Sequence, residues 1–160
     1  MSWLLEPDPQ IAAFTYIPTV PDEAFIEQWL GRYEEGWETG ERAGFAIRAD
    51  GAAVGFAAFV RLDLDAAQGE LGYVVASRER GRGLAGRAVS LLTGWGLDGL
   101  GLERIELRID PRNAASERVA ERAGYTKEGV LRSVAFKEGG RTDVGIWSRL
   151  AGDRSHKLPL

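Results

Sequence analysis

The chain has 160 residues, of which 44% are hydrophobic, and this fits one globular domain with one core. Its formal net charge is −4, which disfavours a nucleic-acid-binding protein. The absence of cysteine excludes disulfides and Cys-ligated zinc and fits a reducing cytoplasm, where we expect this chain. No apolar run is long enough for a membrane helix and no secretory signal is recognisable, so we expect no membrane partner.

The first half of the chain predicts a helix followed by three strands. Apolar residues recur at helical spacing over residues 19–37. Two apolar runs, at 44–47 and 54–62, flank an Asp-Gly pair at 50–51 that is typical of a hairpin turn. A third strand is expected at 70–76.

The second half of the chain predicts helix, strand, helix and a closing hairpin. The full order is therefore α-β-β-β-α-β-α-β-β, which indicates a mixed α/β (α+β) sheet with helices on both faces. The expected elements of the second half are a helix at 83–99, a strand at 104–109, a helix at 113–123, and strands at 130–137 and 142–150.

The side-chain inventory excludes several classes of catalyst. The single histidine, His156, lies in a polar tail without a structured serine nearby, which argues against a Ser-His-Asp triad. Cysteine nucleophiles and His-rich metal sites are excluded, and we expect no metal. Carboxylates, hydroxyls, arginines and backbone amides remain, and they suit direct transfer between two bound substrates better than covalent catalysis.

Charge divides the chain into an acidic first part and a basic second part. Residues 1–50 hold ten Asp/Glu and three Lys/Arg, whereas residues 71–160 hold eleven Asp/Glu and sixteen Lys/Arg. The basic part could hold a polyphosphate ligand, and the acidic part could attract a cation. The alternative is that both charge excesses are solvated surface.

The expected third strand leads into the following helix through a glycine- and arginine-rich run, Arg80-Gly81-Arg82-Gly83-Leu84-Ala85-Gly86. The start of a helix offers unpaired N–H groups to a phosphate. Glycine allows left-handed torsions and close approach of a ligand to the backbone, and arginine bonds phosphate oxygens. The run therefore predicts a phosphate-binding loop.

Other interpretations of this loop are weaker. Glycines at 81, 83 and 86 match the Rossmann fingerprint, with Glu103 or Glu106 as the acidic partner. However, residues 77–79 separate the loop from its strand and at least two strands come first, and a Walker A loop would need Gly-Lys-Ser/Thr. A nucleotide-dependent oxidoreductase is thus a distant alternative, and a glycine-rich turn with surface arginines is another.

Two motifs in this order resemble those of GNAT acetyltransferases. Arg80-x-x-Gly83-x-Ala85 resembles the Gln/Arg-x-x-Gly-x-Gly/Ala motif that cradles the CoA pyrophosphate in that family. Residues 70–75 resemble the preceding strand, which in the family is splayed from its parallel neighbour by a bulge. Residues 113–116 and 123–129 are similar to the second motif of the Rim-type subgroup, which acetylates the N-termini of ribosomal proteins.

The resemblance implies a single GNAT domain over residues 1–160. It places the acceptor side at about 1–69, the acetyl-CoA-binding core at 70–132 and a C-terminal hairpin at 130–150. The fold should be a mostly antiparallel sheet with a splayed parallel pair of strands. We expect the first family strand to be missing and the first helix to shrink to a turn or two near Gln10–Phe14. The sheet edge would then need cover from a partner or the C-terminal tail.

The activity implied is transfer of an acetyl group from acetyl-CoA to a primary amine by direct attack in a ternary complex. The acceptor would be a protein or peptide N-terminus or a small amine, and a homodimer is a candidate assembly. The alternative is a catalytically weak GNAT-fold module that binds CoA or regulates.

The resemblance also assigns the cofactor contacts. The amides of residues 80–85 would hold the pyrophosphate. The backbone groups of Val74 and Val75 would pair with pantetheine, and the Val75 amide would polarise the thioester carbonyl. Asn113 would fix the amide arm of the cofactor, or cap the helix that it precedes. The cofactor-binding residues expected are Val74, Val75, Arg80, Gly81, Arg82, Gly83, Leu84, Ala85, Asn113 and Ser116.

Catalysis is assigned to two residues. Ser116 aligns with a serine near the CoA sulfur in the Rim-type subgroup, and its alternative is a helix-surface serine. Glu70 is the carboxylate nearest the splayed strand and would act as base through water; its alternative is a strand-end residue facing solvent. The chain departs from the family at Ala120, where many members have tyrosine, and at Ala135, where the Rim-type subgroup usually has a carboxylate.

The acceptor side is expected to contain aromatic side chains and an acidic run. The run over residues 34–41 would draw in a cation, or else form a solvated face. Most of the aromatic residues could equally be core. The substrate-binding residues expected are Trp29, Tyr33, Trp37 and Phe45, with Tyr16 nearby.

Overall fold

A computed structural model describes residues 2–137 and 139–153. Its helices are α1 (Pro9–Phe14), α2 (Glu23–Thr39), α3 (Leu84–Gly94) and α4 (Ala114–Arg122), with 3₁₀ turns η1 (Ser2–Leu5) and η2 (Ser77–Glu79) and a π-helical turn η3 (Trp95–Gly99). Its strands are β1 (Ala43–Ala49), β2 (Ala52–Asp63), β3 (Gln68–Val75), β4 (Arg104–Ile109), β5 (Thr126–Lys137) and β6 (Gly140–Leu150).

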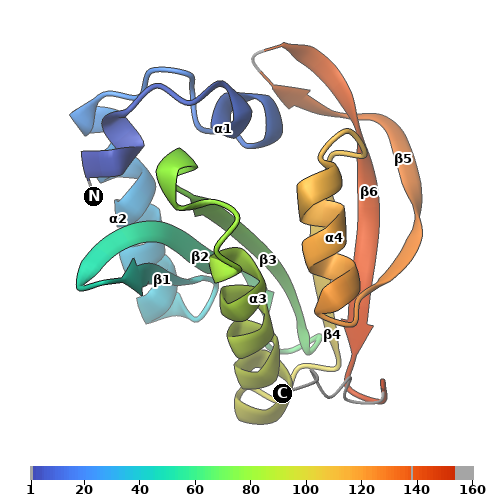
Figure 1. Cartoon of the computed structure of the whole chain (residues 1–160). Coiled ribbons are helices and arrows are strands. Elements are labelled where there is room, and N and C mark those ends of the chain that lie inside the picture. Colours follow the sequence, from blue (N-terminus) through green and yellow to red (C-terminus); the bar gives the residue numbers. More distant parts are fainter. Residues whose placement is uncertain (1, 138, 154–160) are drawn as a thin grey trace.

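Within the described residues, six strands form one sheet in the order β1-β2-β3-β4-β6-β5 (Figure 1). Strands β3 and β4 are parallel, and the other neighbouring pairs are antiparallel. The predicted element order and the mixed, mostly antiparallel sheet are therefore confirmed.

The elements begin and end where local chemistry dictates. Helix α2 starts at Glu23, four residues later than the predicted start at residue 19, because the Asp22 carboxylate caps it by accepting the Phe25 N–H at 2.7 Å. The β1–β2 hairpin turns at Asp50 and Gly51, whose φ angles of 50° and 81° suit the predicted two-residue turn.

Helical segments cover both faces of the sheet (Figure 1), and the buried hydrophobic side chains form two clusters. On one face α3 and α4 pack against the strands, and the buried side chains include Val89 and Ile105. On the other face the N-terminal segment and α2 cover the sheet, and Trp3 and Ile11 are buried beside Phe56. The helices on both faces that the sequence predicted are thus present.

The start of the chain also follows the prediction. In the part of the chain that the structure describes, no strand precedes β1, and α1 has only six residues. Asp8 caps α1 by accepting the Gln10 N–H at 3.0 Å. The C-terminal residues 154–160, including His156, lie outside the described residues, so the expected cover of the sheet edge stays a prediction.

The parallel pair separates part of the way along its length. Its register runs from Gln68 opposite Arg104 to Leu71 opposite Leu107, and β3 continues beyond that point without β4 beside it. The family resemblance placed a bulge in β3, which proves wrong. The extra residue lies in β2, at Val60, because Phe59 and Arg61 of β2 face the consecutive residues Leu71 and Glu70 of β3.

Candidate active site

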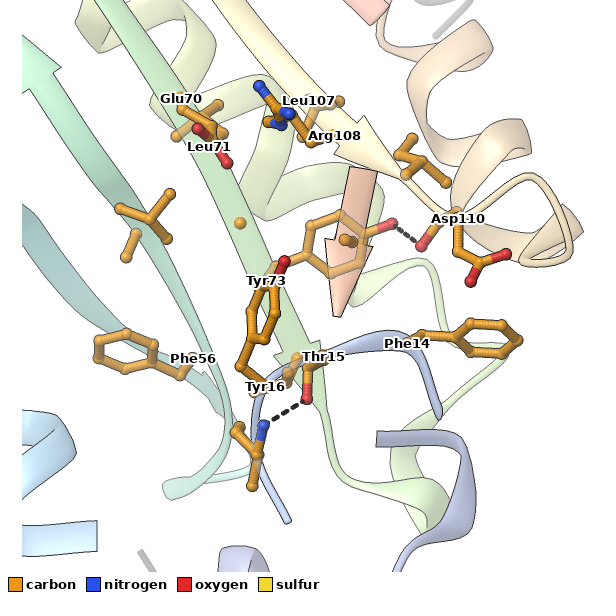
Figure 2. A pocket seen from close by; sticks show the side chains of 18 of the residues that line it. Phe14, Thr15, Tyr16, Phe56, Glu70, Leu71, Tyr73, Leu107, Arg108 and Asp110 are labelled. Carbon is orange, nitrogen blue, oxygen red and sulfur yellow. Dashed lines mark hydrogen bonds between the residues drawn. The ribbon is translucent and has the colours of Figure 1, made fainter. Parts of the chain in front are cut away.

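Two cavities lie on either side of the point where β3 leaves β4. The larger has a volume of about 700 Å³, and Figure 2 shows part of its lining. The smaller has a volume of about 300 Å³ and reaches the glycine-rich loop. Tyr73, Val74, Asn113 and Ser116 line both cavities, so the splayed strands join them into one candidate active site.

The glycine-rich loop presents backbone N–H groups to the smaller cavity. Gly81 and Gly83 have φ angles of 77° and 72°, in the left-handed region that glycine tolerates best. Gly83 precedes α3, and no side chain of the described residues caps this helix. The first backbone bond of the helix joins the Arg87 N–H to the Gly83 carbonyl at 3.1 Å. The amides of residues 84–86 therefore remain open to an anion. The sequence predicted the amides of residues 80–85 as donors, but the Arg80 N–H already bonds the Ser77 carbonyl at 3.3 Å, and the contact with phosphate stays a prediction.

Two arginines of the loop bind carboxylates of the protein itself. The Arg80 guanidinium bonds Asp8 at 2.5 Å, which ties the N-terminal segment to the loop. Arg82 bonds Glu79, and it also bonds Asp50 of the β1–β2 turn at 2.9 Å. Their expected contacts with phosphate thus compete with existing ion pairs, and the loop amides are the better prepared donors.

Other cations near the smaller cavity come from α4. Arg118 and Arg122 line the cavity one helical turn apart, opposite the glycine-rich loop. Sequence reasoning missed them, although their spacing of four residues puts them on one face of the predicted helix. They can complement the charge of a phosphate that lies against the loop.

The free edge of β3 offers backbone groups in alternation. The Ala76 N–H bonds the Val54 carbonyl at 2.9 Å, so this residue points toward β2. Because backbone groups alternate along a strand, Val74 also points toward β2, and Tyr73 and Val75 point into the splay. The predicted pantetheine contact therefore fits the Val75 N–H, because the Val75 carbonyl already accepts from the Arg80 Nε at 3.2 Å. The role expected of Val74 fits Tyr73 better.

A hydroxyl pair bridges the splay where the two cavities meet. The Tyr73 and Ser116 oxygens lie 2.8 Å apart (Figure 2). Burial raises the pKa of Tyr73, and the hydrogen bond with Ser116 opposes that rise. Ser116 is therefore part of the site and not an isolated surface serine. Tyr73 was missed by sequence reasoning, although its place in the splayed strand was a signal.

Helix α4 holds Ser116 in place. Asn113 caps α4, and its Oδ1 accepts the Ser116 N–H at 3.1 Å, so the capping role of Asn113 is confirmed. Its expected contact with the cofactor stays a prediction. Ala120 is fully buried against the core, so a larger side chain at this helix position would have to displace its neighbours.

Glu70 lies on the wall of the larger cavity and does not face open solvent. Its side chain is 22% exposed, and burial raises its pKa. The cationic Arg108 and Arg61 oppose that rise, and the Arg61 guanidinium lies 3.8 Å from the carboxylate. A half-buried carboxyl with a raised pKa is suited to accept a proton near neutral pH.

The expected acceptor aromatics divide into two groups. Trp29 and Tyr33 line the larger cavity with Phe56, and the Trp29 and Phe56 ring centroids lie 4.7 Å apart. Trp37 and Phe45 lie elsewhere and pack against Trp95 of α3's continuation. Helical periodicity could not separate the two groups, because Trp37 lies on the same helix, α2, as Trp29 and Tyr33.

The remaining expectations concern charge, metals and membranes. The four glutamates of the acidic run are exposed and do not line the larger cavity: Glu34, Glu35, Glu38 and Glu41. Ala135 does line this cavity, so position 135 supplies no carboxylate to it. Within residues 2–137 and 139–153, no group of three His, Asp or Glu residues could hold a metal ion. In the same residues, no helix is long and apolar enough to cross a membrane.

Comparisons with known proteins agree with this geometry. The chain is 26% identical over 145 residues to p20 of Bacillus licheniformis, an uncharacterized N-acetyltransferase, covering 89% of this chain and 82% of the relative. It is 26% identical over 119 residues to spermidine N(1)-acetyltransferase of Escherichia coli K12, covering 74% and 63%. The crystallographic fold of RimL, a ribosomal L7/L12 α-N-protein acetyltransferase in complex with coenzyme A, matches with a TM-score of 0.85 and 18% identity, covering 93% and 85%. The family described as Acetyltransferase (GNAT) domain matches residues 2–126, and the chain therefore belongs to the GNAT acetyltransferases.

Proposed function

We propose that this enzyme transfers an acetyl group from acetyl-CoA to a primary amine by direct attack within a ternary complex. The observation that carries the proposal is that the two cavities meet at the splay, where Tyr73 and Ser116 line both of them. A thioester entering from the smaller cavity would meet an amine entering from the larger one. The hydroxyl pair of Tyr73 and Ser116 lies at that meeting point, and Glu70 lies on the amine side.

On the cofactor side, backbone groups would do most of the binding. The pyrophosphate would lie against the amides of residues 84–86, with Arg118 and Arg122 facing it across the cavity. Pantetheine would extend along the free edge of β3, and the Val75 N–H would stabilise negative charge on the thioester oxygen. No metal is needed for these contacts.

The chemical step requires a neutral amine and a stabilised leaving group. The amine nitrogen would attack the thioester carbon, forming a C–N bond as the C–S bond breaks. Glu70 would take the proton of the amine through a water molecule. A CoA thiolate is a good leaving group, so a hydrogen bond from the Ser116 hydroxyl, supported by Tyr73, would suffice.

Two observations bear on the alternative, a CoA-binding module with weak catalysis. Ala120 and Ala135 stand where relatives place a tyrosine and a carboxylate. However, Tyr73 brings a hydroxyl to Ser116 from β3, and Glu70 supplies a carboxylate from the same strand. These two side chains favour an active transferase. The expected cytoplasmic location and homodimer stay predictions.

The proposal is tested by measuring CoA release from acetyl-CoA with a panel of peptide N-termini and small amines. We expect turnover with at least one class of amine and binding of CoA by calorimetry. Binding of CoA without release for any amine would favour the regulatory module. A folded protein that binds no CoA would contradict the proposal altogether.

A further inference from the structure

The larger cavity contains more cationic side chains than its own carboxylates can balance. Arg32, Arg108 and Lys137 line it, and no carboxylate oxygen of residues 2–137 and 139–153 lies within 4.0 Å of their charged nitrogens. Arg42 lines it as well, and its Nε donates to the carbonyl oxygen of Val60 at 3.1 Å. These four side chains line the cavity from different elements, namely α2, the residue before β1, β4 and β5.

The carboxylates of the cavity, Asp110 and Glu70, offset this charge only in part. Asp110 is held by Arg112, whose Nε and terminal nitrogen lie 3.0 Å and 2.7 Å from its two oxygens. This ion pair lowers the pKa of Asp110 and removes its charge from use by a ligand. Glu70 is left as the available carboxylate, and Figure 2 shows it beside Arg108 on neighbouring strands.

Lys137 is one of the two half-buried cations of the cavity, the other being Arg42. Its side chain is half-buried, and its ammonium lies 5.7 Å from the centroid of the Tyr16 ring. Burial lowers the pKa of Lys137, which means that the charged form gains from any anion placed beside it. An anionic group of a ligand would supply that partner.

The charge surplus acts on an amine ligand in two ways. It disfavours the ammonium form, and the amine must be neutral to attack a thioester. It also repels a second or third cationic group on the same molecule while attracting an anionic one. A polyamine is therefore a poor fit for this cavity, and the glutamates of the acidic run at 34–41 are not among its lining residues.

We infer that the acceptor is a primary amine that also carries an anionic group, a carboxylate or a phosphate, which is held by Arg32, Arg108 and Lys137. This inference rests on the proposed N-acetyl transfer, which it deepens by naming the class of acceptor. The balance of the reaction is unchanged: the acetyl group passes from sulfur to nitrogen and the amine proton leaves through Glu70. CoA leaves as a thiolate that accepts a hydrogen bond from Ser116 and then takes a proton from water. The anionic group binds and orients the acceptor and takes no part in bond making.

The test compares kcat/KM for acceptors that differ in charge: an α-amino acid, its carboxamide, an aminoalkyl phosphate and spermidine. We expect the anionic acceptors to react about 10- to 100-fold more efficiently than the amide, which is the usual worth of a hydrogen bond to a charged group. The amine of the carboxamide has the lower pKa, so more of it is neutral and able to attack. This difference favours the carboxamide and therefore works against the expected result. Preference for the phosphate over the carboxylate, or the reverse, identifies the anionic group.

Variants of the three cations test whether the larger cavity causes the preference for anionic acceptors. Arg108→Gln, Arg32→Gln and Lys137→Gln should each lower the ratio of kcat/KM with an anionic acceptor to kcat/KM with the amide. The matched control is Arg48→Gln, which removes a cation of β1 outside the cavity and should preserve the preference.

The outcomes separate this inference from the proposed function. Equal or higher efficiency with the amide or spermidine would overturn the inference while leaving the transferase intact. Equal losses for charged and uncharged acceptors in all three cavity variants would also overturn it. Absence of CoA release with any amine, despite CoA binding, would instead contradict the proposed function.

Discussion

The two halves of the site are built in different ways. The cofactor half uses backbone amides of residues 84–86 and the free edge of β3, which lie close together in the sequence. The acceptor half uses side chains that α2, β2, β3, β4 and β5 bring to one cavity. A site made of backbone groups that are close in the sequence can be predicted from a motif. A site made of side chains that are distant in the sequence can be predicted only when the packing of the helices against the sheet is known.

The largest effect is expected on the acceptor half. Glu70→Gln should lower kcat/KM about 10²- to 10⁴-fold near neutral pH, because general base catalysis is worth this much. Burial raises the pKa of Glu70, so the wild-type rate should fall with acid already above the usual glutamate range. The loss should shrink at high pH, where the amine is neutral without help. A pH–rate profile measures both effects.

The control for Glu70→Gln is Glu27→Gln on the exposed face of α2. The affinity for CoA should be the same in both variants, since the two halves bind their ligands separately. A Glu70→Gln enzyme with the wild-type profile would show that water or another group takes the proton.

A substitution in the glycine-rich loop should weaken CoA binding without changing the acceptor half of the site. Gly86 lies in the first turn of α3, lines the smaller cavity and has open space around an added Cβ. Gly86→Val should weaken CoA binding about 10- to 100-fold, the range that overpacking a site costs. Calorimetry with CoA measures this directly. Gly83→Val should also weaken binding, but its φ of 72° would strain any side chain there.

Gly31→Val is the matched control for the loop. Gly31 lies inside α2, has open space around an added Cβ and lines neither cavity. It should bind CoA like the wild type. Equal CoA affinity in well-folded Gly86→Val and Gly31→Val proteins would remove the start of α3 from the cofactor site.

A smaller effect is expected at the junction between the halves. Ser116→Ala and Tyr73→Phe should each lower kcat about tenfold or less with little change in the KM for acetyl-CoA, because thiolate leaves easily. The double variant should lose little more than either single one if the two hydroxyls act as a unit. Fully additive losses would mean that they act independently.

Tyr125→Phe tests whether the effect belongs to the site. Tyr125 forms a buried hydroxyl pair with Thr93, 2.7 Å apart, outside both cavities. This variant should lose stability and keep kcat. A comparable loss of kcat in Tyr125→Phe would assign the Tyr73 effect to general packing.

The smallest effect is on stability. Because burial raises the folded-state pKa of Glu70, the ionised form is destabilising above that pKa, and this cost disappears below the unfolded pKa as the group protonates in both states. Glu70→Gln should therefore be slightly more stable than the wild type near neutral pH and lose this advantage as the pH falls. Thermal unfolding across pH measures it, and a variant that is less stable at neutral pH would contradict the sign.

The sequence predicted the elements whose signals are local. The strand at Arg104–Ile109, the Asp-Gly hairpin and the loop before α3 are present where expected. Trp37 and Phe45 could not be placed, because periodicity identifies an apolar face but not the surface that it meets. The Tyr73–Ser116 pair joins residues 43 positions apart, and only the packing of α4 over the splayed strand brings them together.

The most direct test of the account is whether the acetyl group passes straight from CoA to the amine. Initial rates should be measured while acetyl-CoA and the acceptor are varied together, and the intact protein mass should be recorded after acetyl-CoA is added alone. Direct attack predicts intersecting double-reciprocal lines and an unmodified protein. Parallel lines, together with a mass increase of one acetyl group on Ser116, would show a covalent intermediate and contradict the account.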